Sequence, residues 1–129
     1  MRFAGYAAIF GRPDLGDVVG AGAFERSLKR RAGAVPLLWQ HRPGRPIGRI
    51  EYLQEDRRGL RVIARLSAGA AGREAAALLE EGTVRGLSFG YRVRAEQGAG
   101  PRALTELELV EISLVTLPMQ PAARVHMVE

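Results

Sequence analysis

The feature that most constrains the fold is a long segment of alternating side chains, residues 104–117, in the second half of the chain. One face of this segment carries Leu107, Leu109 and Glu111, and the other carries Glu106, Glu108, Val110 and Ile112. Successive side chains of a β-strand point to opposite faces, so the pattern predicts one long strand. Pro118 and Pro121 follow the segment and are expected to end it.

Much of the remaining chain consists of short apolar segments separated by glycine, proline and charged residues, which is typical of strands and turns. Residues 55–59 are polar and end in Gly59, and the strand-like segments on either side predict a β-hairpin. Pro43, Gly44 and Pro46 predict another turn. The predicted strands cover residues 3–10, 35–40, 47–54, 60–66, 83–93 and 104–117, with a last short stretch at 125–126, and the predicted loops cover 11–22 and 97–101.

Two segments repeat their apolar residues at helical spacing instead. In the first, residues 23–32, Phe24 and Leu28 are four positions apart and Ala32 continues the stripe. The second, residues 72–81, is rich in alanine and leucine, and Gly82 suits its C-terminal end. The sequence therefore predicts a mainly β protein with two helices and about six or seven strands.

The composition fits a single domain that covers residues 1–129, because this length is close to the most common domain size. The chain has no cysteine, which excludes disulfides, thiol catalysis and a cysteine-based zinc site. No apolar segment is long enough to span a membrane, and no long apolar leader follows Met1. We therefore expect a cytoplasmic protein that does not interact with membranes.

The net charge is +5, and Lys29 is the single lysine among the basic residues. A basic surface can bind nucleic acid, but the arginine pairs at 30–31 and 57–58 are too short to form basic tracts. No aromatic stacking platform accompanies them. Nucleic-acid binding is therefore not the expected function, and a steeply salt-dependent affinity for DNA would be its signature.

Residues 86–90, Gly-Leu-Ser-Phe-Gly, have the spacing of a G-x-S-x-G nucleophile motif centred on Ser88. The residues that follow continue a strand pattern rather than a helix, so we expect Ser88 on a strand, with flanking glycines that allow a tight bend and close approach of a substrate. A serine becomes a competent nucleophile when a nearby base takes its proton. His41 directly follows the apolar segment 35–40, and its imidazole would serve as that base.

A third group usually holds such an imidazole in the required tautomer. Glu111 is one candidate, because it lies in an apolar segment where a buried carboxylate needs a partner, either His41 or one of the arginines. Glu108 is the other candidate, with more polar neighbours. His126 lies close to the C-terminal end, where chains fray, so it is not the expected base.

Other chemistries find little support in the sequence. Two distant histidines without cysteine do not indicate a metal site, and the chain carries no nucleotide or dinucleotide fingerprint. Neither a metal nor a cofactor is therefore expected.

Taken together, these segments resemble the prohead (capsid maturation) serine proteases of tailed phages and gene-transfer agents, which are distantly similar to herpesvirus assemblins. The resemblance covers nearly the whole chain and depends on the order of its motifs. The motifs are Gly5-Tyr6-Ala7-Ala8-Ile9-Phe10, Gly22-Ala23-Phe24-Glu25-Arg26-Ser27-Leu28, Leu37-Leu38-Trp39-Gln40-His41 with Pro46-Ile47-Gly48, Gly86-Leu87-Ser88-Phe89-Gly90-Tyr91, and Leu109-Val110-Glu111-Ile112-Ser113-Leu114-Val115-Thr116 with Pro118.

The resemblance implies a closed or partly open β-barrel flanked by helices, with a serine nucleophile and a histidine base on barrel strands. His41 matches the family histidine and Ser88 the family serine. The third member in assemblins is a second histidine on a later strand, and the matching region here offers Glu111. The implied activity is that of a serine endopeptidase.

The implied substrate is an N-terminal segment of the major capsid protein or a separate scaffold protein, cleaved inside the immature capsid in the host cytoplasm. A non-catalytic scaffold or capsid-interaction module on the same barrel is the alternative hypothesis. An unreactive Ser88 combined with retained capsid binding would distinguish that alternative. The cleavage-site preference and the oligomeric state, a homodimer included, stay open.

Overall fold

The computed structural model describes residues 1–11, 17–31, 34–98 and 102–129, so Ala32 and parts of the two predicted loops, 12–16 and 99–101, lie outside the described residues. The described residues form eight strands and two helices. In chain order these are β1 (Arg2–Ile9), β2 (Asp17–Val19), α1 (Glu25–Arg30), β3 (Leu37–Trp39), β4 (Arg42–Glu55), β5 (Gly59–Leu66), α2 (Ala70–Glu81), β6 (Gly86–Gln97), β7 (Arg102–Val115) and β8 (Val125–Val128).

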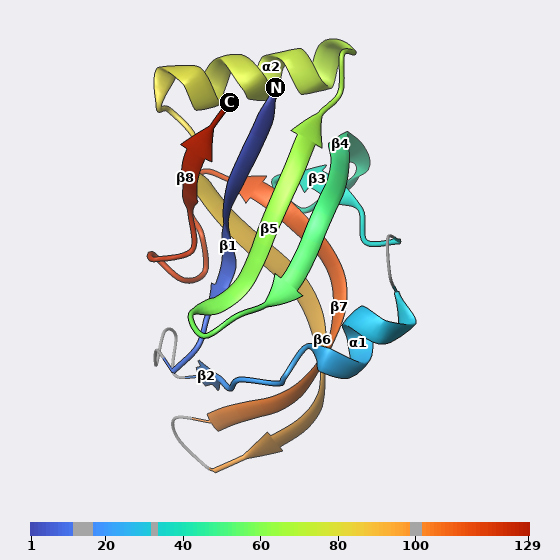
Figure 1. The fold of residues 1–129 in the computed structure, drawn as a ribbon, viewed down its shortest axis with the longest axis vertical. Helices are drawn as coiled ribbons and strands as arrows, with labels where there is room; N and C mark the ends of the chain where they lie inside the picture. Colours follow the sequence, from blue (N-terminus) through green and yellow to red (C-terminus); the bar gives the residue numbers. More distant parts are fainter. Residues whose placement is uncertain (12–16, 32–33, 99–101) are drawn as a thin grey trace.

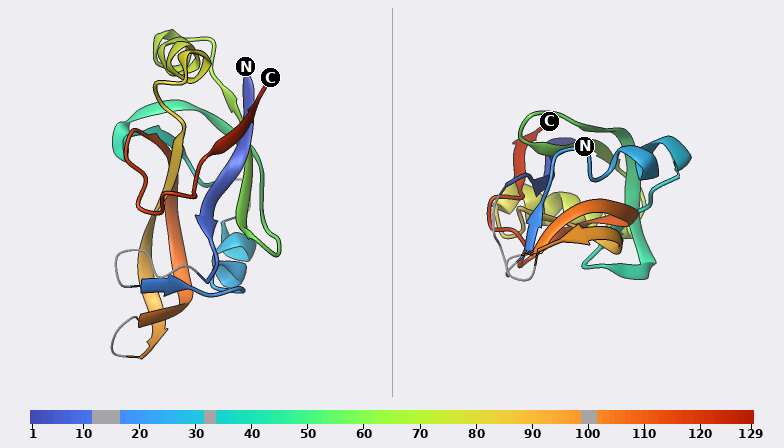
Figure 2. Two further views of the ribbon diagram at one scale, coloured as in Figure 1. Left: turned by 90° about the vertical axis from the view of Figure 1, so that its left-hand side faces the viewer. Right: turned by 90° about the horizontal axis from the view of Figure 1, so that it is seen from below.

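All strands belong to one sheet in the order β2-β7-β3-β4-β5-β1-β8, and β6 pairs with β7 off this path. Strands β4, β5, β1 and β8 run antiparallel and form one layer, and the long β6–β7 hairpin crosses behind it (Figure 1). The side and end views show that these two layers face each other (Figure 2). The sheet does not close into a ring. The predicted mainly β fold with two helices is thus confirmed, and of the closed and partly open barrels that were expected, the described residues form the partly open one, with eight strands rather than six or seven.

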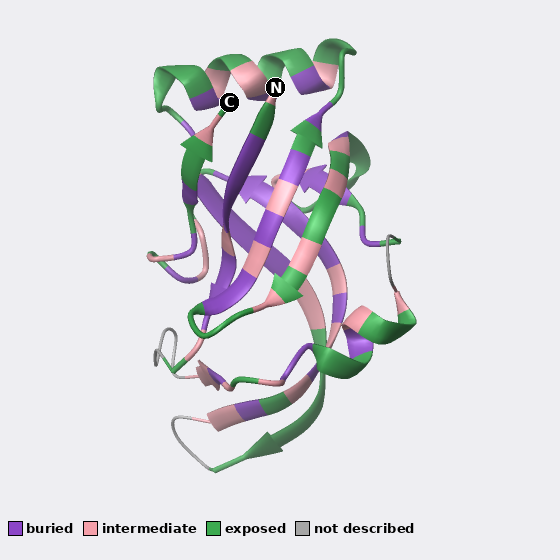
Figure 3. Ribbon diagram, in the orientation of Figure 1, coloured by how far each residue is buried: buried purple, intermediate pink, exposed green. Residues whose placement is uncertain are grey.

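The core lies between the two layers, where the buried residues of β1, β5, β6 and β7 face one another (Figure 3). Phe24 and Phe89 meet edge to face, with ring centroids 5.3 Å apart and an interplanar angle of 84°. Burying each large apolar side chain contributes about 1.5–3 kcal/mol. The largest fully buried side chains are Phe3, Phe24, Phe89, Leu37, Ile47, Leu60, Leu79, Leu87, Leu104, Leu107, Leu109 and Ile112.

The two helices cover the sheet at different places. Helix α2 lies across the end of the sheet where both chain termini are found (Figure 1), and it begins two residues before the predicted segment. Gly82 ends it with φ 77°, and its N–H donates to the carbonyls of Leu78 and Leu79, as expected for a glycine after a helix. Helix α1 packs against β7 and β4. No described helix is long and apolar enough to cross a membrane.

Residues 43–46, where the sequence predicts a turn, lie inside β4 instead. The chain reverses earlier, at Gln40 and His41, because Trp39 already pairs with Arg42. The register between β3 and β4 shifts just beyond this pair, so the proline–glycine segment forms a bulge. Proline is tolerated in a bulge because its missing N–H group is not needed for strand pairing there. The predicted loop 11–22 also contains a short strand, β2, which runs parallel to β7.

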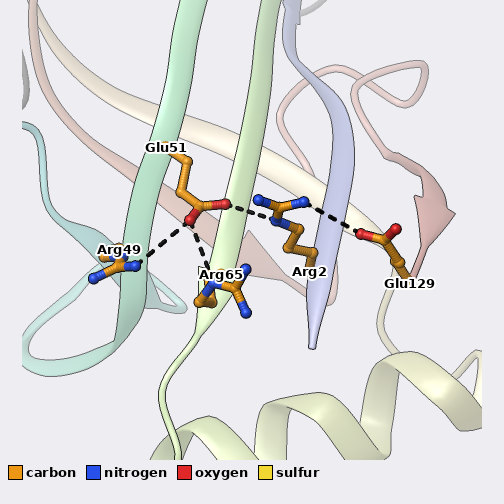
Figure 4. A network of polar contacts seen from close by, with 5 residues as sticks. All are labelled: Arg2, Arg49, Glu51, Arg65 and Glu129. Carbon is orange, nitrogen blue, oxygen red and sulfur yellow. Dashed lines mark hydrogen bonds and ion pairs between the residues drawn. The ribbon is translucent and has the colours of Figure 1, made fainter.

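A polar network ties neighbouring strands together near α2 (Figure 4). Glu51 on β4 accepts a hydrogen bond from Arg2 of β1 at 2.8 Å and one from Arg65 of β5 at 3.3 Å, and Arg49 lies 3.6 Å away. Arg2 also lies 3.5 Å from Glu129. The hydrogen bond from Arg2 is the main cause that holds the pKa of Glu51 below its usual range. Because these side chains are exposed, the pairs orient the strand ends more than they stabilise the fold.

His126 on β8 lies among cationic and aromatic side chains of the neighbouring strands. Its ring centroid is 5.9 Å from that of Tyr6 on β1, and its Nε2 lies 2.8 Å from Nη1 of Arg61 on β5. Arg58 stacks over the Tyr6 ring at 5.2 Å, and the Tyr6 hydroxyl donates to Asp56 at 2.5 Å. Burial, followed by the charges of Arg61 and Arg58, lowers the pKa of His126. The neutral form of the imidazole is therefore favoured over the charged form in the folded chain.

Acidification is expected to destabilise the fold through this histidine. A histidine with a lower pKa in the folded chain stabilises the fold above its unfolded-state pKa of about 6.5, and this contribution is lost as the pH falls from that value through the lower pKa of the folded state. We expect the urea midpoint of the wild-type protein to fall between about pH 7.5 and pH 5, and to fall less in His126→Gln. An equal fall in both proteins would show that the acid sensitivity comes from other groups.

Candidate active site

His41 lies in the two-residue turn between β3 and β4. Gln40 has φ 49° and His41 has φ 62°, which is the left-handed region that such hairpin turns require and that usually selects glycine or asparagine. Each residue of another type held there costs about 1–3 kcal/mol unless its surroundings fix it, and such strain is concentrated at functional sites. The turn is therefore an unusual place for a glutamine and a histidine.

Strand β7 supplies the contacts that fix this turn. β3 runs parallel to β7, so the turn that follows β3 lies beside the C-terminal end of β7. The Gln40 N–H donates to the carbonyl of Leu114 at 3.0 Å, and the His41 N–H donates to Oγ of Ser113 at 3.0 Å. The Gln40 side chain donates to Oγ1 of Thr116 at 2.5 Å and accepts from the Thr116 N–H at 3.1 Å. Both turn residues are thus tied to one neighbouring strand.

The Glu111 carboxylate contacts the His41 ring. Its Oε1 meets Nδ1 of His41, and its Oε2 accepts a hydrogen bond from the Ser113 hydroxyl at 2.5 Å. An ionised carboxylate only accepts, so the shared proton belongs on Nδ1, and Nε2 of the neutral ring is left as a proton acceptor. Glu111 is 6% exposed, so these two partners replace the water that its charge has lost.

The structure separates the two acidic candidates. Glu108 lies 2.5 Å from Arg94 and 3.8 Å from Arg92 and does not contact His41, whereas Glu111 does. Within the described ranges no arginine is paired with Glu111, so the histidine rather than an arginine is its partner.

A bulge explains why Glu111 faces the histidine and not the core. Gly90 pairs with Glu111 and Tyr91 pairs with Leu109, so β7 has an extra residue, Val110, at this point. The buried face of β7 consequently changes from Leu107 and Leu109 to Ile112 and Leu114. Bulges re-aim side chains in this way beside active sites. The sequence shows this change of face as a switch of its apolar positions, from Leu107 and Leu109 to Val110, Ile112 and Leu114.

Gly90 is required by its contact with Glu111. A Cβ atom at position 90 would lie 2.5 Å from Oε1 and 3.0 Å from Cγ of Glu111. Neither Gly86 nor Gly90 has a positive φ, so the tight bend that these glycines would allow is not formed at Ser88. β6 continues as a strand past Ser88, as expected, and its glycines serve close approach.

Ser88 lies on the same face of the sheet as the Glu111 carboxylate. It pairs with Ser113, and paired residues of antiparallel strands have Cβ atoms about 4.5–5.5 Å apart on one face. Ser88 is 2% exposed, and its hydroxyl makes no hydrogen bond to the described residues, including His41. Apo active sites often tighten such contacts only when substrate binds. The structure thus joins His41 to Glu111 directly and brings Ser88 to the strand position next to them.

Two hollows open along β6 on either side of Ser88. One, of about 460 Å³, is lined by His41, Glu111 and Gly90 together with Arg92 and mostly apolar neighbours. The other, of about 340 Å³, includes Gly86 in its lining. The two glycines are separated by about 13 Å of strand, roughly four residues of extended peptide. A peptide chain therefore has space on both sides of the serine.

This constellation has the parts of an activated nucleophile: a buried hydroxyl, a histidine with a free Nε2, and a carboxylate that orients the ring. Sequence reasoning missed Ser113, Gln40 and Thr116, which hold the histidine. The signal for Ser113 was available, since it lies two positions from Glu111 on an otherwise apolar strand and therefore shares its face. The signal for Gln40 was absent, because nothing in the sequence places the turn there.

Comparisons with known proteins identify the family to which the chain belongs. The prohead protease of Enterobacteria phage HK97 is 32% identical over 128 residues, covering 94% of this chain and 57% of that protein. The chain thus spans a little over half the length of this relative. A family model described as caudovirus prohead serine protease matches residues 1–129.

Solved structures share the fold at low sequence identity. The bacteriophage T4 capsid assembly protease has a TM-score of 0.71 and 14% identity, covering 88% of this chain and 80% of that one. The KSHV protease, solved with a hexapeptide phosphonate inhibitor, has a TM-score of 0.64 and 13% identity, covering 96% and 63%. The varicella-zoster virus protease has a TM-score of 0.59 and 15% identity, covering 97% and 62%. The expected likeness to herpesvirus proteases is confirmed, and the family match over residues 1–129 shows that this chain belongs to the caudovirus prohead serine proteases.

Proposed function

We propose that this chain is a serine endopeptidase of capsid maturation in which Ser88 is the nucleophile, His41 the general base and Glu111 the residue that orients the imidazole. The observation that carries the proposal is the His41–Glu111 contact, because it leaves Nε2 as the proton acceptor, and Ser88 pairs with Ser113, which hydrogen-bonds to both of these residues. A buried hydroxyl without a hydrogen-bond partner among the described residues also supports a chemical role for Ser88.

The proposed reaction follows from these positions. Nε2 of His41 takes the Ser88 proton while Oγ attacks the scissile carbonyl carbon, and the carbonyl π electrons move to its oxygen. Collapse of this intermediate breaks the C–N bond, and the imidazolium gives its proton to the leaving amine. Water, activated by the same imidazole, then hydrolyses the acyl-enzyme and restores the serine. Glu111 stays ionised throughout and stabilises the imidazolium.

The proposed substrate is an extended segment of the major capsid protein, at its N-terminal end, or of a scaffold protein, inside the immature capsid. Hollows on both sides of Ser88 support cleavage within a chain rather than at its end, since both flanks of the bond need space. The family description and the names of the HK97 and T4 relatives support capsid assembly as the setting.

Labelling with a fluorophosphonate tests the proposal without a known substrate. This probe phosphonylates serines that are activated by a neighbouring base. Among four serines, mass spectrometry should locate the adduct on Ser88 alone, and His41→Ala should remove it. Ser27→Ala, which changes another buried serine, should label like the wild-type protein.

A folded protein that is not labelled, yet still binds the capsid protein, would contradict the proposal. That result would favour a non-catalytic capsid-interaction module on the same fold.

A further inference from the structure

We propose that Ser113 is a positioning residue that fixes both the backbone of His41 and the carboxylate that orients its ring. The inference rests on the proposed roles of His41 and Glu111, but it concerns a residue with no role in the reaction written above. Ser113 lies on β7 directly opposite Ser88 and is 0% exposed.

Three residues form a closed ring of hydrogen bonds around the Ser113 hydroxyl. The hydroxyl accepts the His41 N–H at 3.0 Å and donates its own proton to Oε2 of Glu111 at 2.5 Å. Oε1 of the same carboxylate meets Nδ1 of His41 and closes the ring. One hydroxyl therefore couples the position of the His41 backbone to the direction in which its imidazole points.

The backbone of His41 needs such a contact because its conformation is strained. With φ 62°, the residue lies in a region that side chains other than glycine and asparagine rarely occupy. The Gln40–Thr116 pair fixes the first turn residue, and Ser113 fixes the second. Without the hydroxyl, the His41 N–H and one oxygen of the buried Glu111 carboxylate lose their partner.

Ser27 of helix α1 provides a matched control, because its hydroxyl also hydrogen-bonds to β7. It is also a buried serine, 1% exposed, and its Oγ accepts a hydrogen bond from the Leu109 N–H of β7 at 2.8 Å. It contacts neither His41 nor Glu111 among the described residues. Ser27→Ala therefore removes one buried serine hydrogen bond to β7 without touching the proposed site, whereas Ser113→Ala removes the ring.

The first readout is the imidazole itself. The chain has only two histidines, so a protein labelled with ¹⁵N-histidine gives two ring systems, with His126 as the internal reference. We expect Ser113→Ala to shift the Nδ1 and Nδ1–H signals of His41 and leave those of His126 unchanged. Ser27→Ala should leave both rings unchanged. This readout does not depend on activity, so it tests the ring even if Ser88 is unreactive.

The second readout is the rate at which the fluorophosphonate labels Ser88. A small misplacement of a catalytic group costs about 10²-fold in rate, which is the loss expected for Ser113→Ala at unchanged adduct position. Ser113→Thr, which restores a hydroxyl, should recover most of the rate. If Ser113→Ala does not fold, Ser113→Cys keeps the side-chain volume with a weak donor and should show the same shift and a slower rate.

The outcomes of these experiments distinguish the positioning role of Ser113 from the proposed role of Ser88 as the nucleophile. His41 signals and a labelling rate that match those of Ser27→Ala would overturn the role of Ser113 while leaving Ser88 as the nucleophile. An adduct on Ser113 itself would overturn it as well, because Ser113 would then be the reacting group. Absence of any adduct in the wild-type protein, with shifted His41 signals in Ser113→Ala, would contradict the proposed function and support the ring.

Discussion

Cleavage of the major capsid protein is expected to stop when Ser88 is replaced by alanine. When the chain is co-expressed with its capsid protein, the wild-type protein should shorten the capsid protein at its N-terminal end, and Ser88→Ala should leave it intact. Loss of a catalytic serine lowers kcat by about 10⁶, which is below detection in such an experiment. Sequencing the N-terminus of the purified capsid protein is the measurement.

The fold should survive this change, so the loss can be assigned to chemistry. Ser88→Ala removes a buried hydroxyl that has no hydrogen-bond partner among the described residues, and its melting temperature should stay close to that of the wild-type protein. His41→Ala should be as inactive, and the double variant no worse, because the two groups act as a unit. Continued cleavage by both single variants would exclude the proposed pair, whereas Ser27→Ala should remain active.

Glu111→Gln is expected to lower kcat by about 10⁴, the loss typical of a triad carboxylate replaced by its amide. The amide of glutamine has the size of the carboxylate, but only its oxygen accepts hydrogen bonds, whereas its NH₂ group donates them. Where its NH₂ group faces Nδ1, the imidazole must place its proton on Nε2, and that nitrogen can no longer take the Ser88 proton. The rate should be measured on a peptide that spans the cleavage site mapped in the capsid protein.

Glu108→Gln is the matched control for this prediction. Glu108 lies on the same strand and pairs with Arg94 and Arg92 at the exposed part of the hairpin, so its replacement should leave the rate close to wild type. An active Glu111→Gln together with an inactive Glu108→Gln would reverse the assignment of the acidic residue.

Much of the fold follows from local pattern. The alternation along residues 104–117 correctly predicts most of β7. The polar turn at 55–59 correctly predicts the β4–β5 hairpin. Helix α2 follows from the spacing of its alanines and leucines and from Gly82. These features depend on neighbours in the sequence, and this is why a pattern can reveal them.

Features that depend on distant pairing were not predictable in this way. Strand β2 forms because residues 17–19 pair with β7 in parallel. The turn-rich sequence around these residues does not indicate that distant partner strand. The turn falls at Gln40 and His41 rather than at the Pro-Gly segment because contacts from β7 hold two unfavourable φ values. Local preference and tertiary contact disagree there, and functional sites are where such disagreements are expected.

The candidate site shows the same division. Glu111 could be chosen from the sequence because a carboxylate in an apolar strand needs a partner, and the structure supplies His41. The bulge that turns Glu111 toward that partner arises from the register of β6 against β7, and the sequence shows it only as a switch of the apolar positions after Leu109, which does not identify the partner. Ser113 was overlooked because its place two positions from Glu111 indicates a shared face but not the two groups that its hydroxyl joins.

A crystal structure of the protein after reaction with a peptidyl phosphonate ester tests the central claim most directly. The quantity to measure is the distance from Nε2 of His41 to Oγ of the residue that carries the phosphorus. The account predicts phosphorus bonded to Oγ of Ser88 and Nε2 within about 3.2 Å of that oxygen, with Glu111 still on Nδ1. Phosphorus on another residue, or an imidazole at position 41 beyond reach of Ser88, would contradict it.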